Sequence, residues 1–229
     1  MAKQRRQKGD AAEEPVRRGQ GRPRTSDKID GAEQLLAAAR QLLLTTHPDQ
    51  ITQTMVAKQA GVDPRLVRYY FGNMDNLLFD LAKSMMKEIE TRMSAASNVE
   101  GSVFDKIKTR INALLQWYIE VPMFWPLILD RVYLAEDDEA TSLRRSFNRS
   151  SYSRLEAIIL KGIDEDLIRK EIDPRFLYLF LIGACEILVT GRPISDILFS
   201  QLEQETLEES YADFLTGIVM RGLRTAPPD

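Results

Sequence analysis

The chain has 229 residues, of which 44% are hydrophobic and 28% are charged, a composition typical of soluble globular proteins. A single cysteine, Cys185, excludes an intramolecular disulfide and a cysteine-based zinc site. No apolar run reaches the roughly 20 residues needed to span a bilayer, and the basic first residues lack the apolar segment of a secretory signal. We therefore expect a cytoplasmic protein with no membrane partner.

The net charge of −3 is distributed unevenly along the chain. Residues 1–28 hold nine basic and four acidic side chains, a net charge of +5, so the other 201 residues carry −8. Because DNA repels an acidic body and attracts a basic end, this asymmetry would orient the molecule on a duplex. The charge distribution therefore allows a DNA-binding function that the overall charge would disfavour.

Residues 1–25 are rich in Arg, Lys, Gln and Gly without apolar periodicity, which predicts a disordered basic arm. Within it, Arg22 and Arg24 flank Pro23 in a piece that resembles the Gly-Arg-Pro core of AT-hook-like arms. Such arms lay arginine into a narrow, electronegative minor groove. We predict that Arg22 and Arg24 contact DNA; a solvated tail that adds only non-specific affinity is the alternative.

We predict that residues 26–73 form a DNA-binding domain of three helices. In the first helix, apolar residues recur at helical spacing from Ile29 to Leu43. This helix should end before Pro48, because the residue preceding a proline resists the α conformation. His47, the only histidine, lies in this turn without a cluster of acidic or cysteine residues, so we interpret it as a surface residue.

The stretch from Ile51 to Phe71 has the pattern of a helix-turn-helix. Thr52 can cap its first helix, and Gly61 can end that helix because glycine reaches the left-handed conformation without a Cβ clash. Asp63 and Pro64 suit the start of the second helix. The second helix is therefore predicted to enter the major groove.

Arg65, Arg68 and Tyr69 fall on the face of this second helix that is opposite Val67. Arginine and tyrosine side chains are donors suited to base edges and phosphates. We predict that they contact DNA; ordinary solvated charges on a surface helix are the alternative reading.

Residues 74–229 are predicted to form a second helical domain. A helix over residues 74–95 would connect it to the first domain, and further amphipathic helices follow as far as Gly222. One short helix is expected over residues 127–132, an acidic loop over residues 136–139, and a chain break at residues 191–193. No segment has strand-like alternation. We therefore predict an all-α fold of about nine helices.

Residues 29–82 resemble the TetR family of transcriptional regulators. The resemblance rests on the Val-Ala…Ala-Gly-Val pattern of residues 56–62 and on the Tyr-Phe-Gly-Asn sequence of residues 70–73, at this spacing. It implies an N-terminal helix-turn-helix domain followed by a C-terminal domain for effector binding and dimerisation. Two positions depart from the family: Arg68 stands where many relatives have a phosphate-binding tyrosine, and Met74 where many have lysine.

At the positions that match the family pattern, the resemblance implies that threonines lie near backbone phosphates and that the second helix lies in the major groove. The predicted DNA contacts in this domain are Thr52, Thr54, Pro64, Arg65, Arg68, Tyr69 and Asn73.

The resemblance further implies an effector pocket in the second domain, formed by large apolar side chains with two polar anchors. The predicted pocket residues are Trp117, Tyr118, Met123, Phe124, Trp125, Arg131, Phe147, Tyr152 and Glu186. Methionine and tryptophan suit an adaptable apolar cavity, which indicates an apolar or amphipathic small molecule. Simple core packing is the alternative for each of these residues.

In family members the last two long helices form a four-helix dimer bundle, which here would be residues 174–190 and 206–223. Small residues would allow close approach of the helices, and large ones would supply apolar area. The predicted dimer contacts are Phe180, Gly183, Ala184, Leu188, Phe214, Gly217 and Ile218. The alternative is that both apolar stripes face the core of their own subunit.

The predicted function is that of a homodimeric repressor released from a palindromic DNA operator by a small-molecule effector. One alternative is a constitutive DNA-binding protein whose second domain only dimerises. The other is an enzyme, but the sequence has one histidine, in a turn, and no Glu-x-x-His pair for a di-metal bundle. We predict no catalytic residue, metal site or cofactor.

Overall fold

The computed structural model describes residues 25–225 of the chain. Arg22 and Arg24, with nearly all of the predicted arm, lie outside this range, so their contact with DNA stays a prediction.

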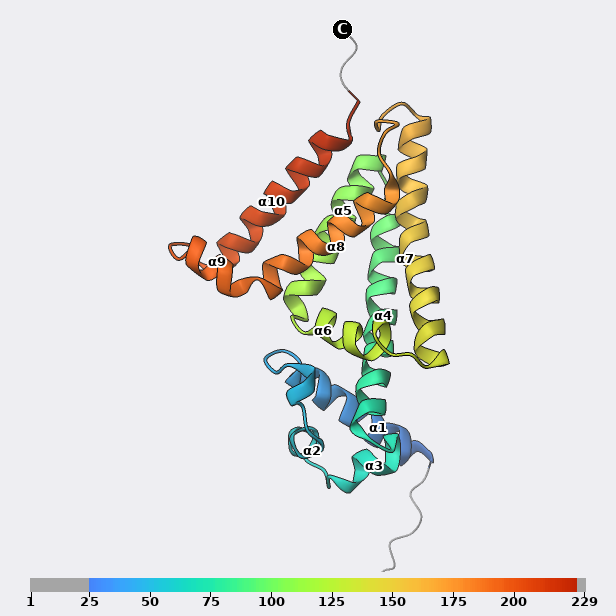
Figure 1. Cartoon of the computed structure of the whole chain (residues 1–229), viewed down its shortest axis with the longest axis vertical. Coiled ribbons are helices and arrows are strands. Elements are labelled where there is room, and N and C mark those ends of the chain that lie inside the picture. Colours follow the sequence, from blue (N-terminus) through green and yellow to red (C-terminus); the bar gives the residue numbers. More distant parts are fainter. Residues whose placement is uncertain (1–24, 226–229) are drawn as a thin grey trace, which may run out of the picture.

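The described part of the chain is all-α, as predicted, with ten α-helices, one 3₁₀ turn and one π-helical turn (Figure 1). The bounds are α1 Thr25–Leu42, η1 Pro48–Gln50, α2 Gln53–Ala60, α3 Arg65–Phe71, α4 Met74–Ser97, α5 Val103–Glu120, α6 Phe124–Ile128, η2 Leu129–Tyr133, α7 Asp138–Asp164, α8 Pro174–Thr190, α9 Arg192–Leu198 and α10 Gln204–Leu223.

Helices α1, α2 and α3 form a small unit at one end of the molecule (Figure 1). Leu35, Val56 and Val67, one from each helix, are fully buried in its core. Gly31 allows α1 to lie close to α3, because a Cβ atom at this position would stand 2.4 Å from the hydroxyl oxygen of Tyr70. The first part of the chain therefore has the three-helix arrangement that its sequence predicts.

Helix α4 runs from this unit into the larger second domain (Figure 1). Its first turns pack against α1 and α3, and its later turns pack against α5 and α7. Its buried face is continuous from Leu77 to Met93, so the two parts of the molecule share one hydrophobic core. A displacement of α4 would therefore change the packing in both parts.

Two segments of the second domain differ from the sequence-based expectation. The acidic stretch 136–139, expected as a loop, includes the first turn of α7, and Asp137 caps that helix by accepting a 2.8 Å bond from the amide of Ala140. Acidic side chains favour a helix N-terminus, where they complement the dipole. The short helix α9 was not predicted, because Gly191 and Pro193 gave the pattern of a chain break.

Helix α8 packs across α5 and α7, and α9 joins it to α10, which contacts α5 (Figure 1). No single helix within residues 25–225 is long and apolar enough to cross a membrane, and α8 and α9 meet the length and composition criteria only as a pair bent by 71°.

Candidate functional site

The helix-turn-helix is built by local hydrogen bonds that the sequence anticipates. The Thr52 hydroxyl accepts a 3.3 Å bond from the amide of Met55 at the start of α2. Gly61 ends α2 in the left-handed conformation, with φ of 68°. The Asp63 carboxylate then accepts a 2.7 Å bond from the amide of Arg65, which starts α3. These contacts fix the direction in which α3 leaves the turn.

The side chains predicted to contact DNA are presented outward. The seven that lie within the described residues are all exposed: Thr52, Thr54, Pro64, Arg65, Arg68, Tyr69 and Asn73. Neither Arg65 nor Arg68 forms an ion pair with any residue in the range 31–225, whereas Val67 between them is fully buried. Tyr69 is 54% exposed, and its ring meets that of Tyr70 edge to face at 4.9 Å. The arrangement gives α3 an outer face with two guanidinium groups.

The start of α4 lies beside this face. Asn73 caps α4, its side-chain oxygen accepting a 2.8 Å bond from the amide of Asn76. Met74, at the position where many relatives have lysine, is half-buried and packs against the hydrophobic core. It therefore contributes packing, and the helix N-terminus itself remains as the group that attracts a phosphate.

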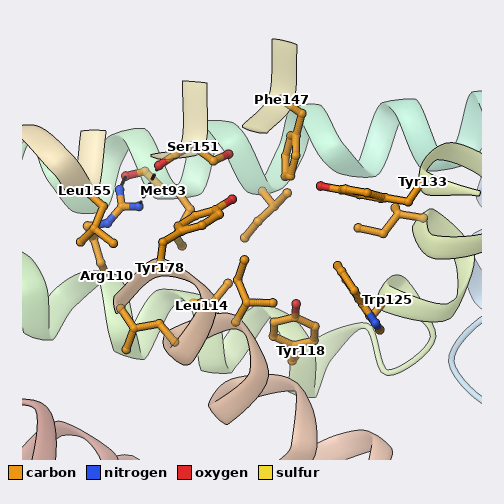
Figure 2. Close-up of a pocket in the computed structure, with 14 residues that line it drawn as sticks. Met93, Arg110, Leu114, Tyr118, Trp125, Tyr133, Phe147, Ser151, Leu155 and Tyr178 are labelled. Atoms are coloured by element: carbon orange, nitrogen blue, oxygen red, sulfur yellow. Dashed lines mark hydrogen bonds between the residues drawn. The ribbon is translucent and has the colours of Figure 1, made fainter. Parts of the chain in front are cut away.

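A cavity lies in the second domain, bounded by α4, α5, the α6–η2 segment, α7 and α8 (Figure 2). Its volume is about 60 Å³. Most of its lining is apolar, with an arginine, a serine and three tyrosines among the lining residues. The lining residues are Ile89, Met93, Arg110, Leu114, Tyr118, Trp125, Ile128, Tyr133, Phe147, Ser151, Leu155, Tyr178, Leu181 and Ile182.

Three of the nine predicted pocket residues line this cavity: Tyr118, Trp125 and Phe147. Trp117 does not, because consecutive residues of a helix point about 100° apart and Tyr118 takes the direction of the cavity. Trp117 is fully buried in the core, with its ring 5.2 Å from that of Phe124.

Five further residues that were predicted for the pocket lie outside this cavity. Phe124 is buried against Trp117, and Met123 packs on the outside of the same core. Tyr152 does not line the cavity and donates a 2.8 Å hydrogen bond to Glu156, one turn along α7. Glu186 is half-buried on α8 and does not line the cavity.

Arg131, the fifth of these, reaches towards the DNA-binding unit. Its guanidinium lies 2.8 Å from the carboxylate of Asp75 at the start of α4 and 3.9 Å from that of Asp49 in η1. Arg131 belongs to the π-helical turn η2, which also carries the cavity-lining Tyr133. A single five-residue turn therefore touches both the cavity and the DNA-binding unit.

Sequence reasoning missed the polar part of the cavity, above all Arg110. Arg110 is 6% exposed, and burial lowers the pKa of its guanidinium to about 10. Burial likewise raises the pKa of Tyr178 to about 12. A signal for Arg110 was present, because it occupies the i+3 position of the apolar stripe formed by Ile107, Ile111 and Leu114.

Four of the predicted dimer contacts are open to solvent in the protomer. Phe180 on α8 is 48% exposed, Phe214 on α10 is 60% exposed, and Ile218 lies on the same helix as Phe214. Gly183 is exposed between the large side chains of α8, and a Cβ atom there would meet nothing within 4 Å. Further apolar side chains extend this surface along α8: Phe176, Leu179 and Ile187.

The other three predicted dimer contacts are engaged within the subunit. Leu188 is only 6% exposed and packs into the core of its own subunit. The carbonyl of Ala184 accepts a 2.6 Å hydrogen bond from the Tyr211 hydroxyl. Gly217 is half-buried, with the guanidinium of Arg221 beside it. The apolar stripes of α8 and α10 thus divide between an inner and an outer face.

The structure combines a helix-turn-helix that exposes two arginines with a helical domain that encloses a cavity, and one long helix joins the two. This combination is typical of DNA-binding transcriptional regulators. Residues 101–228 match the family model for the tetracyclin repressor-like C-terminal domain. The chain therefore belongs to the TetR family of transcriptional regulators, which confirms the family that residues 29–82 resemble.

Solved structures share this fold. The fatty acid degradation regulator FadR from Bacillus halodurans is 18% identical, with a TM-score of 0.61 over 82% of this chain and 95% of that one. FadR from Bacillus subtilis, in complex with stearoyl-CoA, is 20% identical, with a TM-score of 0.59 over 80% and 97%. The ketosteroid regulator KstR2 of Mycobacterium tuberculosis is 14% identical, with a TM-score of 0.66 over 85% and 95%. Curated proteins gave no match.

Proposed function

We propose that this chain is a homodimeric repressor that binds a palindromic operator and is released by a small apolar or amphipathic effector. The observation that carries the DNA-binding part is the outer face of α3, where Arg65 and Arg68 are exposed and free of ion pairs with the described residues. One such unit reads few base pairs, so useful specificity takes two units on a two-fold site. Residues 26–73 would bind DNA, and residues 74–229 would bind the effector and dimerise.

The cavity favours a repressor that responds to an effector, rather than a protein that binds DNA constitutively. A domain that only dimerises gains nothing from a cavity, and internal voids cost packing energy. The cavity volume of about 60 Å³ is well below the roughly 300 Å³ of a drug-sized site. We therefore propose that side chains of α6 and α7, with Trp125 and Phe147 among them, move apart when the effector enters. The stearoyl-CoA complex of FadR and the steroid regulator KstR2 are examples of this fold that support an apolar effector.

An enzymatic function has less support from the groups that would act as nucleophile or base. His47 lies exposed in the turn before η1. Cys185 is fully buried, and burial raises the pKa of its thiol to about 12, which keeps it protonated at neutral pH.

Alanine substitution of the two arginines tests the DNA-binding proposal. Arg65→Ala and Arg68→Ala should each lower affinity about 10- to 100-fold, because each removes a phosphate or base-edge contact worth roughly 1–3 kcal/mol. Affinity would be measured at moderate, fixed salt on a fragment recovered by genome-wide footprinting. Arg149→Ala, an exposed arginine on α7, is the matched control and should bind like the unchanged protein. Equal affinities for all three variants would contradict the proposal.

A further inference from the structure

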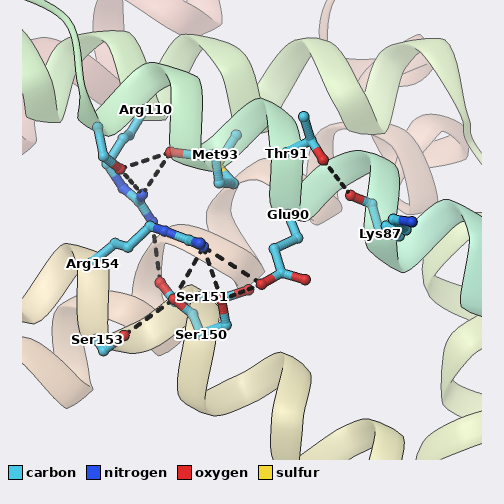
Figure 3. Close-up of polar contacts among 10 residues, drawn as sticks. Lys87, Glu90, Thr91, Met93, Arg110, Ser150, Ser151, Ser153 and Arg154 are labelled. Atoms are coloured by element: carbon cyan, nitrogen blue, oxygen red, sulfur yellow. Dashed lines mark hydrogen bonds and ion pairs between the residues drawn. The ribbon is translucent and has the colours of Figure 1, made fainter.

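Arg110 is a buried cation without a counter-ion. It projects from α5 at one end of the cavity, with Trp125 at the other end (Figure 2). No carboxylate among residues 31–225 forms an ion pair with its guanidinium, and after burial a second cation, Arg154, lowers its pKa further. The carboxylate of Glu90 is instead bound by Arg154, at 3.7 Å, and by the Ser150 hydroxyl (Figure 3). Buried charges are normally paired, so this arrangement needs an explanation.

The hydrogen bonds of Arg110 leave part of its donor capacity unused. It donates to the carbonyl of Met93 at 3.1 Å, to the hydroxyl of Ser97 at 2.5 Å and to the carbonyl of Ser151 at 3.4 Å. A guanidinium has five N–H donors, so these three bonds leave two donors over. All three acceptors are neutral. Tyr178 and Ser151, which lie beside this group, also line the cavity.

A purely structural role explains only part of this arrangement. Met93 and Ser97 belong to the last turns of α4, so Arg110 caps the C-terminal end of that helix. The negative end of a helix dipole amounts to about half an elementary charge. Capping therefore offsets only part of a full positive charge. Although burial lowers its pKa to about 10, the guanidinium is still cationic at neutral pH.

We infer that the effector is an organic carboxylate, whose carboxylate group pairs with Arg110 and whose apolar body extends towards Trp125 and Phe147. This inference rests on the proposed function, since it assigns the chemical class of the effector. A carboxylate supplies two acceptor oxygens to two neighbouring guanidinium donors, the geometry in which arginine binds anions most strongly. The rest of the lining is apolar and the enclosed volume is small, which favours this compact anion over a polyphosphate headgroup.

The test compares acids with their uncharged esters on the full-length protein. Octanoate and 4-phenylbutanoate would be titrated calorimetrically beside methyl octanoate and methyl 4-phenylbutanoate. Each acid should bind about tenfold or more tightly than its ester, because hydrogen bonds to a charged partner are stronger than those between neutral groups. Arg110→Gln should reduce this preference to within about threefold, and Arg110→Lys should retain part of it.

The neighbouring arginine provides the matched control. Arg154→Gln removes a guanidinium that pairs with Glu90 and does not line the cavity, so it should keep the preference for the acid. Equal affinities of acid and ester for the unchanged protein would overturn the inference, as would a preference that survives in Arg110→Gln. The comparison on the unchanged protein is decisive even if Arg110→Gln does not fold.

Release of operator DNA separates this inference from the proposed function. If acids and esters bind equally and both release the operator, only the carboxylate inference fails. If neither binds while DNA binding is intact, effector release fails and the inference fails with it.

Discussion

Gly61 sets the angle of the helix-turn-helix through its backbone alone. Its φ of 68° lies in the left-handed region, yet a Cβ atom there would meet nothing within 4 Å. Any effect of Gly61→Ala on stability therefore comes from backbone strain and not from a clash. We predict that this variant lowers the free energy of unfolding by about 1–2 kcal/mol, the cost of holding a non-glycine residue in this conformation.

Gly222 on α10 is the matched control, because a Cβ atom there would also meet nothing within 4 Å but the backbone lacks the positive φ. Gly222→Ala should raise stability by up to about 1 kcal/mol through helix propensity. Urea denaturation monitored by circular dichroism measures both variants. Equal stability changes of the same sign would show that conformation does not distinguish the two positions.

Local chemistry explains why the helix-turn-helix was predictable. Thr52, Gly61 and Asp63 act on backbone groups close to themselves in the chain, so their roles follow from sequence spacing. The cavity lining depends instead on how several helical segments rotate against one another. That is why Tyr118 and Trp117 could not be told apart, and why Arg110 was overlooked in an apolar stripe.

At the scale of the element, the π-helical turn η2 connects the cavity with the DNA-binding unit. Its Tyr133 lines the cavity and donates a 2.8 Å hydrogen bond to Asn148 on α7. Its Arg131 pairs with Asp75 at the N-terminus of α4. A sequence gives no periodicity for a single π-helical turn, and residues 127–132 were accordingly predicted as an ordinary short helix. The contacts that η2 makes with both regions were therefore not visible before the fold was known.

We predict that Arg131→Ala weakens the coupling between effector and operator. Effector binding should stay within about twofold, since Arg131 does not line the cavity, while the effector-induced loss of DNA affinity should shrink by up to about fivefold. This limit follows from the roughly 1 kcal/mol at most that a partly exposed ion pair contributes. Operator titrations with and without effector measure the change.

Lys83→Ala is the control for this coupling. Lys83 pairs at 2.7 Å with Glu139 and so joins α4 to α7 without reaching the DNA-binding unit. Its removal should leave coupling unchanged. If Arg131→Ala also retained full coupling, the effect of the effector on DNA affinity would be transmitted through α4 alone.

At the scale of the whole molecule, the outer faces of α8 and α10 form an apolar surface that one protomer leaves uncovered. Large exposed apolar patches mark protein interaction sites. The surface comprises Phe176, Leu179, Phe180, Ile187, Phe214 and Ile218. Covering it with the same surface of a second copy would give a two-fold dimer, matching the two-fold symmetry of a palindromic site.

We predict that Phe180→Glu combined with Phe214→Glu makes the protein monomeric at micromolar concentration, because each change places a charge where apolar area would be buried. Both side chains are exposed in the protomer, so helix content should be retained. Leu134→Glu, an exposed leucine beyond η2, is the control and should remain dimeric in sedimentation velocity. The monomer should bind operator at least about tenfold more weakly, since each half-site contributes its own contacts. A double variant that sediments as a dimer would remove α8 and α10 from the interface and leave the exposed apolar residues of α9 as the next surface to test.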